Sequence, residues 1–554
     1  MTTRRTHLAV FVLAAACYLA FGAYLALDQQ FYSGDALSRV QAAQAALVSR
    51  DPHLSAIGFV FTPLTAIAEI PLVALSPLWP AFTTHAMSAV VMSALFMAGS
   101  VMQLAGIVTD RGLSWRIGAL VVGAYALNPM IVFYGANGMS EAPYLFCLVW
   151  AVRRLIRWVD TDDVHDLVTA GIALALSYLT RYDGGAAGFA AMIFVAVISF
   201  RRASSSPVET VTRRRRAVVD AAVVALPTAV AFTVWASTSW LITGDLFAQF
   251  TSEYGNAAII SQLGGSGSDT ATTALEFSAT CMAIMAPLLV LLVPGVAVVR
   301  RRRLRAVAVS LAVFGAVLAF QVFAYSRGTT FGFLRFYITV IPLSAVLAAL
   351  AAPMRRDMPY RRLGANAELP DLTPSPGGWR RLIPVAAAAA LVVGVGTTWV
   401  GMASPKYAPQ EFALRAVIGA DPDSTDKLLL DARRVARSFS TERELAHYLD
   451  SLNLPDGAVV CDTVYGFAVI VQSQRPRQFV IPSDADFARI LNAPAAHRVQ
   501  YILAVPNEGR GTSDAVNVRF PTMYENGAQI AALVLEARNQ GADQPDWRLY
   551  RVVS

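Results

Sequence analysis

Long apolar runs alternate with short polar segments from the N-terminus to about residue 402. A run of roughly 20 apolar residues forms a helix long enough to cross the hydrocarbon core of a bilayer. Eleven such runs predict a polytopic α-helical membrane protein. The predicted spans are residues 7–27, 85–108, 116–134, 141–157, 164–180, 184–200, 217–241, 272–299, 306–325, 332–352 and 382–402.

One further apolar run, residues 57–79, is interrupted by three prolines and by Glu69. If it crossed the membrane, every later loop would change sides. With a cytoplasmic N-terminus and no crossing at 57–79, most arginines fall on the inside, including the runs 213–216 and 300–303, as the positive-inside rule requires. We therefore interpret 57–79 as a re-entrant or surface-lying hairpin within a first outside loop of about residues 28–84. Irregular backbone at that depth is tolerated where protein or a cavity buries it.

An odd number of spans places the C-terminus outside. Residues 1–403 then form the membrane domain, and residues 404–554 form an extracytoplasmic domain. In the second domain the pattern predicts a helix at 442–452, a further element of undecided type at 466–473, and strands at 457–464, 477–482, 499–506 and 547–554. Strands that alternate with helices indicate a small α/β domain. The segment Pro353–Gly378 is predicted to be a cytoplasmic loop.

Composition supports the membrane class. Hydrophobic residues make up 55% of the chain and charged residues 15%, with a mean hydropathy of +0.49, whereas soluble domains carry about 25% charge. The net charge of +7 does not indicate a nucleic-acid partner, because the arginines lie between apolar runs. The spacing of the four cysteines, Cys17, Cys147, Cys281 and Cys461, suits neither a metal site nor a disulfide.

Polar residues recur at all five outward turns between the spans. Ionisable groups near a membrane surface are costly unless they are paired or face a wet cavity, so they are functional candidates. They are Asp35 in "SGDALSR", Glu141 in "NGMSEAP", Arg181, Tyr182 and Asp183 in "LTRYDGG", Asp245 in "WLITGD", and Arg327 and Arg335 in "YSRGTTFGFLRFY".

Each candidate also has a purely structural interpretation. Asp35 could be the N-cap of a helix. Glu141 could lie in the first turn of its helix, where the helix dipole favours a negative charge. Arg181 and Asp183 could form a local ion pair. The two late arginines could be snorkelling anchors, and Asp245 could be a turn residue. These interpretations do not explain why acids and arginines occur together on one side.

Chemistry offers an explanation for that grouping. Outward carboxylates can serve as a general base and as ligands for a sugar, and guanidinium groups bind phosphate in a bidentate manner. A lipid-phosphate sugar would hold its tail among the spans and its head at this surface. Transfer to an acceptor hydroxyl needs a base near the attacking oxygen and stabilisation of the departing phosphate. The transition state would resemble an oxocarbenium ion.

From Phe11 to Ala352 the chain resembles the GT-C superfamily of integral-membrane glycosyltransferases, which use polyprenyl-phosphate sugars. The resemblance rests on the order and sidedness of the motifs above, together with "GFVFTPL" in the first loop. It implies that Asp35 is catalytic or metal-binding and that Glu141 is the second-loop acid. It also implies that Arg327 or Arg335 contacts the donor phosphate with Arg181 nearby. Tyr182, Asp183 and Asp245 are the predicted substrate contacts.

The first loop departs from the family pattern, because it has one Asp and no Asp-x-Asp or Asp-Glu pair. We therefore expect no cofactor and favour a metal-independent reaction, although a divalent cation stays open. The architecture and composition of the chain resemble those of actinobacterial cell-envelope mannosyl- and arabinosyltransferases. The resemblance implies mannose or arabinofuranose as the sugar, and a glycan, glycolipid or protein acceptor.

Two alternatives remain. A transporter or flippase of lipid-linked envelope intermediates would also be a helix bundle, but it would typically show inverted repeats, and we find no internal repeat. A non-catalytic GT-C-like scaffold would have the same pattern. The extracytoplasmic domain shows no phosphate loop and no catalytic constellation, so we interpret it as an acceptor-contacting or partner-docking domain.

Overall fold

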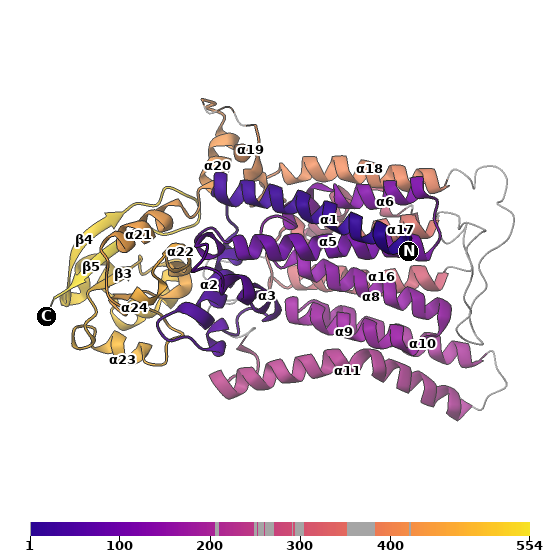
Figure 1. Cartoon of the computed structure of the whole chain (residues 1–554), viewed down its shortest axis with the longest axis horizontal. Helices are drawn as coiled ribbons and strands as arrows, with labels where there is room; N and C mark the ends of the chain where they lie inside the picture. The colour runs from indigo at the N-terminus through magenta and orange to yellow at the C-terminus, as the bar shows by residue number, and fades with distance from the viewer. Residues whose placement is uncertain are drawn as a thin grey trace.

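The computed structural model describes residues 2–204, 210–248, 252, 260, 271–290, 292–293, 304–351, 383–419, 421 and 423–553. A bundle of long helices runs along the length of the molecule (Figure 1). Its elements are α1 (Thr2–Ala23), η1 (Tyr24–Asp28), α5 (Met87–Asp110), α6 (Trp115–Ala126), α7 (Pro129–Tyr134), α8 (Glu141–Thr161), α9 (Val164–Thr180), α10 (Gly184–Ser204), α11 (Thr210–Thr243), α14 (Ala271–Met285), α16 (Leu304–Ser326), η4 (Leu334–Tyr337), α17 (Val340–Ala351) and α18 (Ile383–Met402).

These helices occupy the predicted spans, and the chain is a multi-pass membrane protein. Seven helices of the described part are long and apolar enough to cross a bilayer. Helices α6 and α9 are apolar but shorter, and α8 carries three arginines near its far end. The predicted span 116–134 is divided at Asn128, whose side chain caps α7 by accepting from the Met130 amide at 3.1 Å. The end of predicted span 272–299 and the loop Pro353–Gly378 lie outside the described residues.

The first loop folds into α2 (Gly34–Val48), η2 (Leu54–Ile57), α3 (Leu64–Val73) and α4 (Ala81–Thr84). The apolar run 57–79 supplies only the ten residues of α3 in helical form. At 1.5 Å per residue, α3 is about 15 Å long, roughly half of what a hydrocarbon core requires. That length agrees with a segment that does not cross, which stays a prediction.

The C-terminal domain contains a five-stranded sheet in the order β2-β1-β3-β5-β4. Strand β1 pairs in parallel with β2 and β3, while β5 pairs antiparallel with β3 and β4. The strands are β1 (Val459–Val460), β2 (Phe479–Val480), β3 (Tyr501–Ala504), β4 (Ala531–Ala537) and β5 (Trp547–Val552). The helices are η6 (Glu411–Ala413), α19 (Leu414–Val417), α20 (Lys427–Ala436), α21 (Ser440–Ser451), α22 (Thr463–Gln472), η7 (Pro476–Gln478), α23 (Phe487–Asn492), η8 (Ala495–His497), η9 (Gly509–Ser513), α24 (Ala515–Arg519), α25 (Met523–Asn526) and η10 (Gly527–Gln529).

The predicted helix is present, and each of the four predicted strands contains a strand, but β1 and β2 are only two residues long and Thr463 and Val464 of the first predicted strand belong to α22. Two further details differ. Residues 466–473, left undecided by the sequence, fall almost entirely within helix α22, because Asp462 caps its first turn by accepting from the Val464 amide. Strand β4 has no sequence counterpart. Its sequence, AALVLEA, consists largely of good helix formers, and its pairing with β5 decides its conformation.

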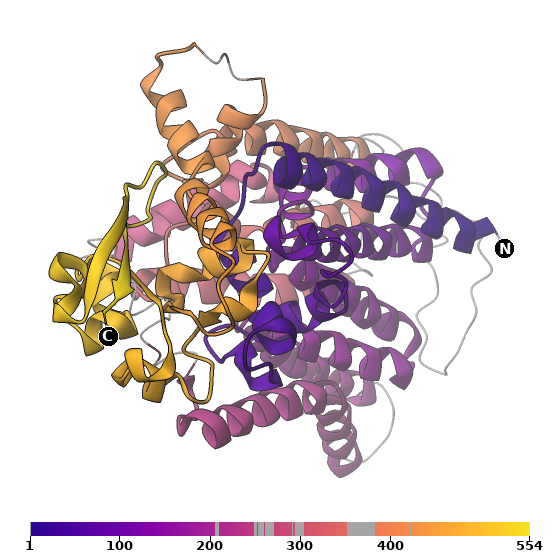
Figure 2. The ribbon, with the colours of Figure 1, turned by 60° about the vertical axis from the view of Figure 1, so that its left-hand side comes forward.

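The C-terminal domain and the first loop lie at one end of the bundle, here called the domain end, while the N-terminus lies towards the other (Figures 1 and 2). One buried cluster joins Leu37 and Val40 of α2 to Phe467 and Val471 of α22. Arg50, just after α2, lies 2.9 Å from Asp484 of the C-terminal domain and also pairs with Asp486. Helix α22 is therefore held directly against the helix that carries Asp35.

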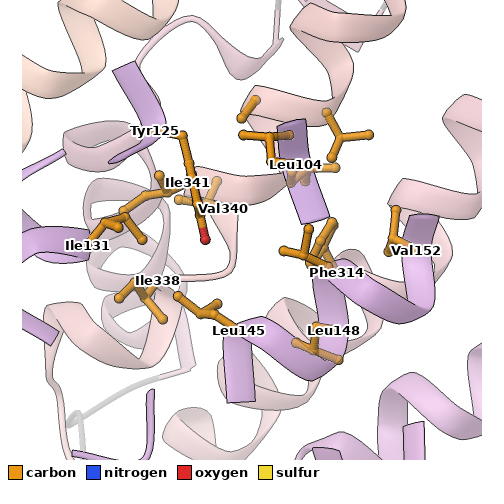
Figure 3. Packing of buried hydrophobic residues seen from close by; sticks show 14 of the residues in the cluster. Leu104, Tyr125, Ile131, Leu145, Leu148, Val152, Phe314, Ile338, Val340 and Ile341 are labelled. Carbon is orange, nitrogen blue, oxygen red and sulfur yellow. The ribbon is translucent and has the colours of Figure 1, made fainter. Parts of the chain in front are cut away.

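Buried apolar side chains fill the interior of the bundle. Leu104, Leu145 and Phe314 of α5, α8 and α16 meet in the region drawn in Figure 3, and each is completely or almost completely buried. Interiors of this kind are close-packed and resist distortion. The core therefore fixes the ends of α8, α9 and α16, where the polar motifs lie.

Candidate active site

A cavity of about 1700 Å³ opens at the domain end of the bundle. Its wall comes from three parts of the chain: the first loop, the ends of the bundle helices and the C-terminal domain. Of the residues predicted from the sequence, the wall contains Asp35, Arg181, Tyr182, Asp183 and Arg335. Apolar and aromatic side chains such as Phe320, Phe331 and Phe336 line the part beside the bundle.

Asp35 lies in the first turn of α2 and faces Arg335. The helix begins at Gly34 with Ser33 as its N-cap residue, and Asp35 makes no capping hydrogen bond. The N-cap interpretation of Asp35 is therefore wrong. Its Oδ2 atom lies 3.5 Å from Nη2 of Arg335, and 41% of its side chain is exposed to the cavity. The carboxylate is thus accessible to a ligand that enters the cavity.

Arg335 is held by aromatic rings on η4 rather than by water. Its guanidinium lies 4.9 Å from the ring centre of Phe333 and 5.4 Å from that of Phe336. Only 7% of its side chain is exposed, so the snorkelling interpretation is wrong for this residue. It donates a hydrogen bond to Gln410, and its Nε atom lies 3.8 Å from Glu141 without a hydrogen-bond partner in the described structure.

A second group of charges lies beside Arg335. Nη1 of Arg181 is 2.9 Å from Oε1 of Glu141, and its Nε is 3.4 Å from Oδ1 of Asp183. Gln321 of α16 donates to the other Asp183 oxygen at 2.7 Å. The local ion pair that the sequence suggested for Arg181 and Asp183 is present, and Arg181 also pairs at a shorter distance with Glu141, which is 40 positions away in the chain. Three bundle helices are joined by this group.

Several site residues were not predicted. Gln410 contacts Arg335, and Glu411 accepts a hydrogen bond from Tyr134. Gln410 and Glu411 follow the last predicted span, in a segment for which we predicted no motif. Burial raises the pKa of Glu411, although Arg335 and the Tyr134 hydroxyl act in the opposite direction. The polar pair in "PQEF", which comes shortly after the last span, could have been identified in the same way as the polar residues of the outward turns.

The arginines determine the charge state of Asp35. Burial alone would raise its pKa, but the charges of Arg335, Arg39, Arg181 and Arg510 outweigh burial, and the pKa of Asp35 lies below its usual value. Asp35 is therefore ionised at neutral pH. A ligand anion that neutralised these arginines would raise its proton affinity.

Two predicted residues lie away from this group. Arg327 is exposed and stacks on Phe323 of its own helix at 5.4 Å. Asp245 accepts from the Phe247 amide at 2.8 Å, as a turn residue does. Neither lines the cavity. Tyr182 lines it and donates a hydrogen bond to the Val60 carbonyl of the first loop.

The described residues contain no group of three or more His, Cys, Asp or Glu side chains that could hold a metal ion. The preference for a metal-independent reaction stays a prediction. All four cysteines are free, as their spacing predicted.

Comparisons with known proteins place this architecture in a fold class. Residues 81–235 match the family model described as dolichyl-phosphate-mannose-protein mannosyltransferase. That match includes Glu141, Arg181 and Asp183 but ends before Arg335 and begins after Asp35. No curated protein matches the chain significantly.

Among solved structures, the chain is similar to ArnT from Cupriavidus metallidurans bound to undecaprenyl phosphate. The identity is 13%, the TM-score is 0.54, and the match covers 99% of this chain and 98% of that one. The apo state of the same protein gives a TM-score of 0.53 at 12% identity, with the same coverage. The archaeal oligosaccharyltransferase AglB from Archaeoglobus fulgidus matches at 12% identity and a TM-score of 0.38, over 91% of this chain and 70% of that one.

The fold is that of the ArnT structures, a bundle of membrane helices together with a C-terminal α/β domain. The whole length of the chain, including that domain, takes part in the match to ArnT.

Proposed function

We propose that this protein transfers a sugar from a polyprenyl-phosphate donor to a hydroxyl group of a cell-envelope glycan, glycolipid or protein. One observation carries the proposal: an ionised carboxylate, Asp35, and a buried guanidinium, Arg335, face each other in a cavity between the membrane helices and a soluble domain. A lipid-linked sugar phosphate needs an apolar surface for its tail and a cation for its phosphate. The transfer also needs a base near the acceptor hydroxyl.

Arg335 is the better of the two late arginines for the donor phosphate. It lines the cavity, its ion pairs with Asp35 and Glu141 are long, and its Nε atom has no hydrogen-bond partner in the described structure. A phosphate oxygen would complete its hydrogen bonds. Arg327 is exposed outside the cavity. The undecaprenyl phosphate named in the ArnT structure is a ligand of the class proposed here.

The proposed reaction is a single displacement. The acceptor oxygen forms a bond to the anomeric carbon and gives its proton to Asp35. The bond between the anomeric carbon and the phosphate oxygen breaks, and the phosphate leaves with the electron pair. Arg335 stabilises the negative charge that grows on the phosphate. A phosphate bound to Arg335 also offsets the positive charge that lowers the pKa of Asp35. The carboxylate therefore becomes a stronger base as the donor binds.

Mannose is the first sugar to test, and arabinofuranose is the second. The description of the matched family names a mannose donor, and the sequence motifs resemble enzymes for both sugars. We place the reaction on the extracytoplasmic side, because the arginine run 213–216, near the start of α11, lies at the opposite end of the bundle (Figure 1).

The test uses full-length protein in phosphatidylcholine nanodiscs, polyprenyl-phosphate mannose as donor and octyl α-mannoside as a probe acceptor. Asp35→Asn keeps the size of the side chain and removes the base. We expect it to fold, to bind donor and to lose about 10²- to 10⁴-fold in transfer rate, equivalent to about 3–5 kcal/mol. Near wild-type transfer by Asp35→Asn would reject Asp35 as the base and leave Glu141 as the next candidate.

A further inference from the structure

The C-terminal domain contributes one arginine to the wall of the cavity. Arg510 lies on η9, in a domain whose sequence predicted no catalytic group, and it shares the cavity wall with Asp35. Arg181 and Arg335 both have carboxylate partners. Among the described residues, Arg510 has no carboxylate within ion-pair distance; its contacts are a carbonyl and a ring.

Those contacts hold Arg510 in place from one side. Nη2 donates to the Val464 carbonyl at 3.2 Å, and the guanidinium lies 5.0 Å from the ring centre of Tyr465. Both partners belong to the first turn of α22. Gly511 allows the tight path of η9, because a Cβ atom there would lie 2.0 Å from the Pro506 carbonyl oxygen. The arginine is therefore a fixed feature of the cavity wall.

The position of α22 relates Arg510 to Asp35. Helix α22 packs on α2 through the cluster of Leu37, Val40, Phe467 and Val471. Helix α2 thus carries the carboxylate, and α22 carries Val464 and Tyr465, the two residues that contact Arg510 of η9. Burial lowers the pKa of Arg510, and the neighbouring Tyr465 and Asp35 offset this only in part. A desolvated guanidinium of this kind is costly unless an anion approaches it.

We propose that Arg510, supplied to the cavity wall by the C-terminal domain, is a second ligand of the donor phosphate beside Arg335. This inference rests on the proposed function, and it goes beyond it by making the soluble domain part of the donor site. The phosphate of the leaving polyprenyl phosphate carries one more negative charge than that of the intact donor. Two arginines stabilise that additional charge better than one.

Arg39 does not fill this role equally well. Its Nη1 atom donates to the Asp35 carbonyl one helical turn earlier, at 3.1 Å, and its guanidinium stacks on Phe61 at 4.6 Å. It therefore supports the first turn of α2. Arg510 makes the same two kinds of contact, with the Val464 carbonyl and the Tyr465 ring, but it is half-buried, whereas Arg39 is only 7% exposed, so the remaining donors of Arg510 are more accessible to a ligand.

The experiment measures binding of undecaprenyl phosphate and of the neutral alcohol undecaprenol to full-length protein in detergent. Arg510→Gln should weaken phosphate binding by about 10- to 100-fold, as expected for a hydrogen bond to a charged group, and should leave undecaprenol binding unchanged. Arg510→Lys should bind the phosphate more weakly than the wild type and more tightly than Arg510→Gln, because lysine keeps the charge and loses the planar guanidinium. Arg519→Gln is the matched control, since Arg519 also stacks on a ring, that of Phe520, and lies outside the cavity wall.

The outcomes separate this inference from the proposed function. If wild-type protein shows no preference for the phosphate over the alcohol, both proposals are wrong. If Arg335→Gln loses the preference while Arg510→Gln and Arg510→Lys keep it, only the inference on Arg510 is wrong. Unchanged phosphate binding with a raised KM for octyl α-mannoside in Arg510→Gln would also overturn it and would assign Arg510 to the acceptor. An unchanged unfolding midpoint identifies the variants that are folded.

Discussion

Arg181 and Glu141 form an ion pair that joins the start of α8 to the turn between α9 and α10, with 2.9 Å between Nη1 and Oε1. Only 1% of the Glu141 side chain and 18% of the Arg181 side chain are exposed. Arg181 also lies near the rings of Tyr144 and Phe336. Its Nη1 donor is therefore occupied by Glu141 and its charge is shared with Asp183 before any ligand enters, and we infer that Arg181 positions two carboxylates instead of binding phosphate itself.

The first prediction tests that role with a double-mutant cycle. Arg181→Met leaves Glu141 buried without its partner, which should lower the free energy of unfolding by about 3–5 kcal/mol. Glu141→Gln should cost a similar amount, and the double variant should cost less than the two single variants together. Thermal unfolding in detergent measures all three. If Arg181→Met keeps its stability and loses undecaprenyl phosphate binding, Arg181 is a phosphate ligand, as the family resemblance implied.

The second prediction concerns the turn that carries Arg181 and Asp183. A Cβ atom on Gly184 would lie 2.5 Å from backbone atoms of Ser177 and Tyr178, whereas one on Gly185 would meet only a Tyr178 ring carbon at 3.6 Å. Gly184→Ala should therefore displace the turn, cost about 1–3 kcal/mol and reduce transfer. Gly185→Ala is the control and should retain both stability and activity. Equal behaviour of the two variants would show that the turn does not depend on this close approach.

The third prediction concerns pH and the C-terminal domain. Burial raises the pKa of Glu442 from its usual 4.5 to about 7, although Trp547 Nε1 donates to it at 2.8 Å. The folded domain keeps a proton that the unfolded chain releases, so stability should fall as pH rises from 4.5 to about 7. Above pH 7 the free energy of unfolding should be about 3 kcal/mol lower than below pH 4.5 on account of this group. Glu442→Gln should remove this dependence and stabilise the domain at pH 8.

Cys461 provides the measurement for Glu442. It is fully buried in the same domain, so its labelling reports local opening when the other three cysteines are replaced. Comparing Glu442→Gln with the parent at each pH corrects for the reactivity of the thiol. Equal labelling rates at pH 8 would contradict the prediction.

The fourth prediction concerns orientation. We expect the domain end to be extracytoplasmic, because the arginine run 213–216, near the start of α11, lies at the other end (Figure 1). A cysteine introduced at exposed Asn507, near Gly509, should react with a membrane-impermeant thiol reagent added to intact cells. A cysteine in place of exposed Arg214, near the start of α11, should react only after lysis. The reverse pattern would place the site in the cytoplasm.

The sequence alone determined the class of the protein and the membrane-spanning helices. Apolar runs of bilayer length leave few structural choices, since every backbone group within the hydrocarbon must be satisfied by a helix. It also identified Asp35, Glu141, Arg181, Asp183 and Arg335 as candidates, because charged groups beside a membrane are rare and stand out against their surroundings.

Tertiary structure decided how these residues pair and which others join them. The contact between Asp35 and Arg335 spans 300 positions, and that between Tyr134 and Glu411 spans 277; no local pattern specifies such contacts. Arg327 and Arg335 look alike in sequence, and only packing against Phe333 and Phe336 buries one of them. Arg510 lies at the cavity because α22 packs on α2, a contact between apolar surfaces that either helix could make with many others.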